Sequence, residues 1–164
     1  MRIVFLALLV ALLGAVTPIP AQYTEDIGVT DYFQLWHACQ PVPLRVEPMP
    51  AAAVEMGLTR EAIATTVRSR LRAARLYSSE DTPSRRPYLY VNVTTVNRTR
   101  AFSVTFHFFK WLPDPITELE SFATTWTTGM VGVHGGDAGY VLSSVSRKTD
   151  EFIDAYLRVN EAAC

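Results

Sequence analysis

Alternating hydrophobic and polar residues predict three long β-strands in the second half of the chain. From Tyr88 to Val96 and again over residues 101–111, aliphatic or Phe side chains alternate with hydroxyl, amide and Tyr side chains. The polar residues 97–99 lie between these segments, so the pattern predicts an antiparallel hairpin. Residues 121–133 are rich in Thr, Trp and Phe and predict a third strand. Its alternating positions are Phe122, Thr124, Trp126, Thr128 and Met130.

A different spacing of apolar residues predicts two helices. Over residues 60–75, Ile63, Val67 and Leu71 recur every four positions, and Thr59 stands where an N-cap is needed. A second helix is expected after Asp137, which can serve as its N-cap. Its apolar stripe consists of Val141, Val145, Phe152, Tyr156 and Val159.

Residues 22–57 predict an irregular N-terminal segment with one short edge strand at residues 44–46. Four prolines between positions 41 and 50 exclude a central strand there, and residues 51–57 read as a linker. The element order is then strand, helix, three strands, helix. Two helices on one face of a mainly antiparallel sheet of about four strands make an α+β two-layer sandwich, with residues 58–164 as its core.

The first 21 residues have the pattern of a secretory signal peptide. Arg2 precedes an apolar run that ends near Val16, and residues 17–21 supply small residues and prolines before a cut after Ala21. The apolar run is shorter than the roughly 20 residues that a spanning helix needs. We expect a periplasmic or secreted protein with no transmembrane span after cleavage. The alternative is a retained N-terminal anchor.

Export changes the interpretation of the two cysteines. Disulfides persist in oxidising compartments, and Cys39 and Cys164 are an even pair. A cysteine at the chain end has little packing role, because ends usually fray. The sequence therefore predicts a Cys39–Cys164 disulfide, against the alternative of two unrelated thiols.

Composition and charge give no reason to expect nucleic acid as a partner. The formal net charge is −1, and 19% of the residues are charged. Half of the basic charge expected after cleavage lies in residues 60–86. This Arg-rich helix flank either grips an anionic polymer or lipid headgroup, or is a solvated face. The solvated face, partly neutralised by Asp150, Glu151 and Asp154, is the favoured interpretation.

No catalytic motif stands out in the loop from His134 to Gly139. Its glycines could expose backbone N–H groups to an anion, but the Lys and the spacing of a phosphate-binding loop are missing. A tight turn capped by Asp137 is the favoured interpretation, and a small hydrolase using His134 and Asp137 is the enzyme alternative. His37, His107 and His134 lack the spacing of a zinc site, so neither metal nor cofactor is predicted.

Aromatic residues on the face of the sheet away from the helices are the strongest candidate for binding. Tyr88, Tyr90, Phe109 and Trp111 share the face that carries Thr and Asn. Exposed aromatics among hydroxyls suit an envelope protein, peptide or glycan. The alternative is that the N-terminal segment through Trp36, tethered at Cys39, folds over them. The full candidate set is Tyr88, Tyr90, His107, Phe109, Trp111, Trp126, His134 and Asp137.

Several strings together resemble a group of small exported bacterial proteins of unknown function. They are Gly57–Thr59, Ser69–Tyr77, Tyr88–Val91, Ala123–Trp126 and the end of the chain from Phe152 to Asn160. The resemblance covers about residues 39–164. It implies a periplasmic setting but no activity and no catalytic residues. The resulting hypothesis is an envelope binding or accessory module without catalytic activity.

Overall fold

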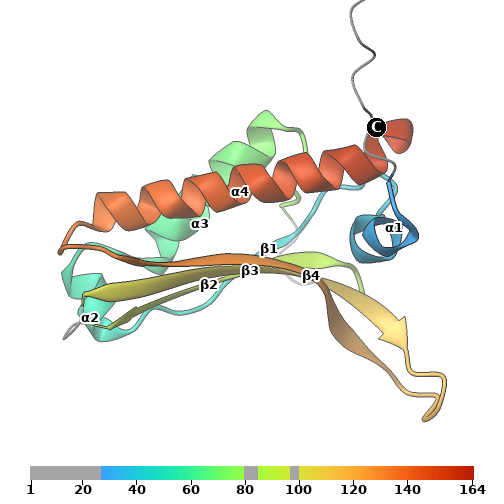
Figure 1. Ribbon diagram of the computed structural model, residues 1–164, viewed down its shortest axis with the longest axis horizontal. Coiled ribbons are helices and arrows are strands. Elements are labelled where there is room, and N and C mark those ends of the chain that lie inside the picture. Colours follow the sequence, from blue (N-terminus) through green and yellow to red (C-terminus); the bar gives the residue numbers. More distant parts are fainter. Residues whose placement is uncertain (1–26, 80–84, 97–99) are drawn as a thin grey trace, which may run out of the picture.

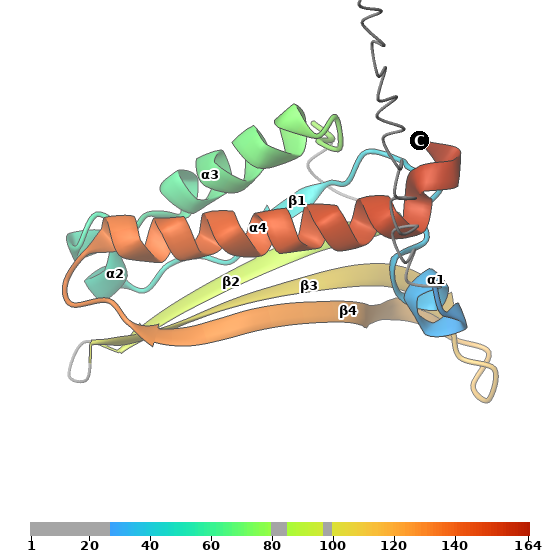
Figure 2. The same cartoon turned by 45° about the horizontal axis from the view of Figure 1, so that its top comes forward.

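The computed structural model describes residues 27–79, 85–96 and 100–164, and it has the predicted α+β architecture (Figure 1). The predicted signal peptide and the predicted turn at residues 97–99 lie outside the described residues. Helices and a single sheet form two layers (Figure 2). The two-layer prediction is therefore confirmed.

The sheet has four strands in the order β1 (Leu44–Val46), β2 (Tyr88–Val96), β3 (Ala101–Pro113) and β4 (Glu120–Val133). Strand β1 runs parallel to β2, whereas β2–β3 and β3–β4 are antiparallel. The predicted short edge strand and the predicted hairpin are both present. Strands β1 and β4 therefore form the two edges of the sheet.

Helices α3 (Arg60–Ala73) and α4 (Ala138–Asn160) cover one face of the sheet (Figures 1 and 2). Both predicted caps are present: Ala62 N donates to Thr59 Oγ1 at 3.1 Å, and Gly139 N donates to Asp137 Oδ1 at 2.7 Å. The predicted apolar stripes of both helices are buried. The covered face of the sheet supplies Leu89, Val91, Val93, Phe102, Val104, Phe106 and Phe108.

Two short helices in the N-terminal part were not predicted. Helix α1 (Val29–Leu35) lies where no period was visible, and α2 (Ala51–Glu55) replaces the predicted linker. Helices of five to seven residues make at most two turns, so no apolar repeat can develop in them. Each of them buries one side chain, Leu35 in α1 and Ala53 in α2.

A β-bulge divides strand β4. Phe108 pairs with Trp126 and Phe109 pairs with Thr124, so Thr125 has no opposite residue on β3. An extra residue moves the following side chains to the other face. The alternation predicted from Phe122 to Met130 is therefore wrong: Phe122 lies on the uncovered face, whereas Trp126 contacts Phe152 of α4 at a ring distance of 5.5 Å.

The predicted disulfide between Cys39 and Cys164 is present, and it joins the segment after α1 to the last residue. Asn160, which is fully buried, reinforces this junction. Its Oδ1 accepts from His37 N at 2.9 Å and from Cys39 N at 3.2 Å, and its Nδ2 donates to Leu35 O at 3.0 Å. The segment after α1 is thus held to the end of α4 by a covalent bond and by one amide side chain. The 3₁₀-helix η1 (Glu161–Ala163) leads from Asn160 to Cys164.

Candidate functional site: an aromatic row on the open sheet face

The face of the sheet opposite α3 and α4, here called the open face, carries six aromatic side chains in contact. We call them the aromatic row, which consists of Trp111, Phe122, Tyr88, Phe109, Tyr90 and His107. Strand register brings them together, because Tyr88 is opposite Phe109, Tyr90 is opposite His107, and Trp111 is opposite Phe122. Directly opposite residues share a face of the sheet. The row therefore crosses β2, β3 and β4.

The rings of the row pack on one another in stacked and edge-to-face arrangements. Tyr88 and Phe109 are stacked, with centroids 5.0 Å apart and planes 8° from parallel. Phe122 meets Tyr88 and Trp111 at steep angles, with centroid distances of 5.1 Å and 4.9 Å. Except for Tyr88, which is buried, the members of the row remain partly exposed.

A charged pair closes one end of the row. The Arg85 guanidinium lies 5.3 Å from the centroid of the Trp111 ring and 3.4 Å from Glu120 Oε2. The indole N–H of Trp111 donates to the same carboxylate oxygen at 3.0 Å. The polar edge of the indole is thus satisfied while its ring stays in the row.

At the other end, the Tyr90 hydroxyl donates to the Glu47 carboxylate, which follows β1. Burial, together with this hydrogen bond and the carboxylate charge, raises the pKa of Tyr90 to about 12. Thr127 Oγ1 lies 3.2 Å from His107 Nδ1. The row is therefore framed by polar groups, and the Tyr90 phenol stays protonated at neutral pH.

The described part of the N-terminal segment does not cover the row. Helix α1 packs on the covered side, where Thr125 Oγ1 donates to Gln34 O at 2.7 Å and Lys110 Nζ donates to Phe33 O at 2.6 Å. Lys110 shares its face with Phe108 rather than with Phe109. Burial lowers the pKa of Lys110 to about 8. Of the two interpretations of the open face, the one in which the segment through Trp36 covers the row finds no support in residues 27–36.

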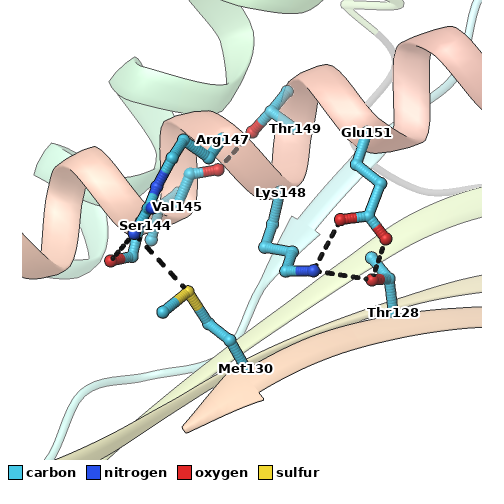
Figure 3. Close-up of polar contacts among 8 residues, drawn as sticks. All are labelled: Thr128, Met130, Ser144, Val145, Arg147, Lys148, Thr149 and Glu151. Atoms are coloured by element: carbon cyan, nitrogen blue, oxygen red, sulfur yellow. Dashed lines mark hydrogen bonds and ion pairs between the residues drawn. The ribbon is translucent and has the colours of Figure 1, made fainter. Parts of the chain in front are cut away.

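Trp126 does not belong to this site, although the sequence suggested it. The bulge at Thr125 turns Trp126 to the covered face, where it packs on the core. The next two residues on that face, Thr128 and Met130, contact polar side chains of α4 (Figure 3). Lys148 Nζ lies 3.1 Å from Thr128 Oγ1 and 2.5 Å from Glu151 Oε2, and the Thr128 hydroxyl also donates to Glu151.

Glu151 was expected to neutralise the arginines of α3, and this expectation is wrong. Burial opposes its ionisation, but hydrogen bonds from Lys148 and Thr128 outweigh burial and lower the pKa of Glu151. The neutralising role of Asp150 is present, since Arg70 Nη1 lies 3.0 Å from Asp150 Oδ1. Among the described residues, the Arg70–Asp150 pair links the Arg-rich flank to α4.

In the loop after β4, His134 and Asp137 each accept a hydrogen bond from a nearby backbone N–H. His134 is 4% exposed, and its Nδ1 accepts from Gly136 N at 3.0 Å. Gly135 and Gly136 have φ values of +61° and +94°, which a glycine adopts without strain. A cavity of ≈250 Å³ lies beside this loop. His134 Nδ1 and Asp137 Oδ1 both accept from backbone N–H groups, as the tight-turn interpretation requires. The buried His134 Nε2 has no hydrogen-bond partner among the described residues.

His37 lies on the covered side, apart from the aromatic row. Its Nδ1 is 3.3 Å from the Tyr156 hydroxyl, which donates to Gln40 O at 2.8 Å. Burial, with the charges of Lys110 and Arg86, lowers the pKa of His37 to about 4. Across the described ranges, no group of three or more His, Cys, Asp or Glu side chains could hold a metal ion.

Four contributors to these sites were missed by sequence reasoning: Glu47, Arg85, Phe122 and Asn160. Phe122 was grouped with Trp126 because the bulge leaves no local mark in the sequence. Glu47 and Arg85 reach the row from segments that flank strands, so only the folded register brings them there. Asn160 falls on the buried side of α4, one position beyond Val159, and a polar residue at such a position could have signalled a clamp.

Comparison with known proteins adds no relative. The chain matches no family model, no curated protein and no solved structure. Among the described residues, no helix is both long enough and apolar enough to cross a bilayer.

Proposed function

We propose that this protein is an exported binding module of the bacterial envelope, without catalytic activity, that contacts its partner through the aromatic row. The observation that carries the proposal is the row itself. Six aromatic side chains lie in contact on the face that α3 and α4 leave open, and none of them belongs to the core cluster on the covered face. Partly exposed aromatic clusters with polar rims are typical of binding surfaces.

The geometry of the row favours a polypeptide over a sugar. Stacking of a sugar needs a free ring face, but Tyr88 and Phe109 stack on each other, and Arg85 lies over Trp111. Partly exposed rings and the polar groups at both ends suit apolar side chains and backbone of a peptide or protein. Glu47, Arg85 and Glu120 then supply charges of both signs around the contact.

The test is titration of the oxidised protein with a peptide library and, separately, with purified envelope glycans, followed by NMR of the aromatic side chains. We expect peptides to shift the resonances of the row and the double variant Tyr90→Ala/Trp111→Ala to weaken binding about tenfold or more. Tyr140→Ala is the matched control, because Tyr140 is 43% exposed on α4, on the covered side.

Equal losses of binding in the control and in the double variant would exclude the row as the contact surface. Binding of glycans alone would exclude the polypeptide partner. Hydrolysis of any of these substrates that disappears in His134→Ala would replace the proposal with the hydrolase alternative.

A further inference from the structure

The two edges of the sheet are protected very differently. At one edge, β1 has three residues, lies between prolines and carries the exposed Arg45. Short length, proline and charge all prevent another strand from adding to an edge. At the other edge, β4 has 14 residues, and Ser121–Val133 contains no ionisable side chain and no proline. Within the described residues, no strand pairs with the outer side of β4.

Strand register identifies the backbone groups of β4 that point outward. His134 N donates to Arg100 O at 2.8 Å, in the register that places Val133 opposite Ala101. Because hydrogen bonding alternates along an antiparallel strand, even-numbered residues from Trp126 to Gly132 bond to β3. The N–H and C=O groups of Thr127, Gly129, Val131 and Val133 therefore point away from β3.

The same residues are the exposed ones. Val131 is 79% exposed and Val133 is 66% exposed, and both lie on the open face. The glycines beside them are required by β3, since a Cβ at Gly132 would lie 2.7 Å from Phe102 Cε1 and one at Gly129 would lie 2.9 Å from Val104 O. This edge therefore combines three features: outward backbone groups that pair with no other described strand, exposed valines, and glycines that leave few side chains along it.

From these observations we infer that β4 pairs with β4 of a second copy of this chain, antiparallel, through Thr127–Val133. A two-fold axis places this segment against the same segment of the second copy, so a charge within it would lie near an identical charge. The segment carries none. Odd-numbered residues meet odd-numbered residues in this pairing, and the two open faces join into one surface of eight strands. This inference does not rest on the proposed function.

Charged side chains beside this segment determine how salt affects the stability of the dimer. Lys148 and Glu151 form an ion pair above Thr128, while the Arg147 guanidinium lies 4.0 Å from Met130 Sδ (Figure 3). Arg147 brings a positive charge near the axis from each copy. Screening by salt should therefore strengthen the dimer rather than weaken it.

The experiment measures the mass of the oxidised protein by sedimentation from about 1 µM to about 1 mM. We expect a monomer–dimer equilibrium whose Kd rises about tenfold or more in Val131→Lys and in Val131→Pro. The proline variant removes an outward N–H and no bond to β3, so the fold should survive. Val96→Lys is the matched control, because Val96 is 48% exposed on the open face but belongs to β2.

A wild-type protein that stays monomeric over this range overturns the inference. Equal weakening by Val96→Lys and Val131→Lys also overturns it, because the open face rather than the edge would then be the contact. Hydrogen exchange tests whether another segment of the same chain covers β4 instead of a second copy. Protected amides of Gly129 and Val131 in a monomeric protein would show such a covering segment.

Discussion

The covered and open faces of the sheet both carry rows of aromatic rings, but they use them differently. Phe102, Phe106 and Phe108 on the covered face are fully enclosed by α4 and its neighbours. Phe109 and Trp111 on the open face are enclosed only by other rings and by a charged rim. Aromatic content therefore does not distinguish core from surface. The distinction lies in whether aliphatic side chains and a helix close over the rings.

Breaking the disulfide should have the largest effect, because it removes a constraint that the bridge places on the unfolded chain. A bridge between residues 125 apart contributes roughly 4–5 kcal/mol in the chain-entropy model. We expect Cys39→Ser/Cys164→Ser to lose about this much free energy of unfolding in urea. The ring-current shifts of Tyr88 and Phe109 should persist in the folded fraction, because both rings lie on the open face. Loss of these shifts before unfolding would contradict the independence of the two faces.

Truncating one ring on each face compares the faces directly. Phe106→Ala leaves a cavity in the closed core and should cost about 3–5 kcal/mol. Phe109→Ala removes ring contacts at a solvated surface and should cost about 1–2 kcal/mol. Chemical denaturation of the two variants at the same pH measures the difference. Equal losses would mean that the open face is as closed as the core, and would also weaken the proposed binding surface.

Periodicity predicted the parts of the fold in which a pattern repeats several times. The alternation in β2 and β3 and the stripes of α3 and α4 are each long enough to distinguish a strand from a helix. The short helix α2 has too few residues to show a period. The prolines around residues 44–46 predicted the short edge strand without any repeat, because a single proline is enough to exclude a central strand.

The site was predicted only as far as strict alternation holds. Tyr88, Tyr90, His107, Phe109 and Trp111 were placed on the correct face because β2 and β3 are regular. Trp126 was grouped with them because nothing local in Ala123–Thr127 shows which residue bulges. The free energy that places the bulge at Thr125 comes from tertiary contacts, among them its hydrogen bond to Gln34 O. Sequence alone cannot weigh such contacts.

The smallest expected effect on stability comes from comparing two histidines, one on the covered side and one on the open face. Burial gives His37 a pKa of about 4, below its ordinary value of 6.5. Between these values the unfolded chain binds a proton that the native protein does not, so the free energy of unfolding decreases as the pH falls from 6.5 to 4. His37 is partly solvated, and we expect a discounted contribution of about 1–2 kcal/mol. Urea unfolding of wild type and His37→Gln at pH 7.5 and at pH 4.5 measures it.

The variant should show a shallower decrease in stability toward acid, because glutamine cannot take up the proton. His107→Gln is the control on the open face. His107 is partly exposed there and contacts Thr127 and the rings of Tyr90 and Phe109, whereas His37 contacts the buried rings of Phe108 and Tyr156. Carboxylates titrate in the same range in all three proteins, so only the difference between variants reports on the imidazole. An equal flattening by both substitutions would show that burial on the covered side is not the cause.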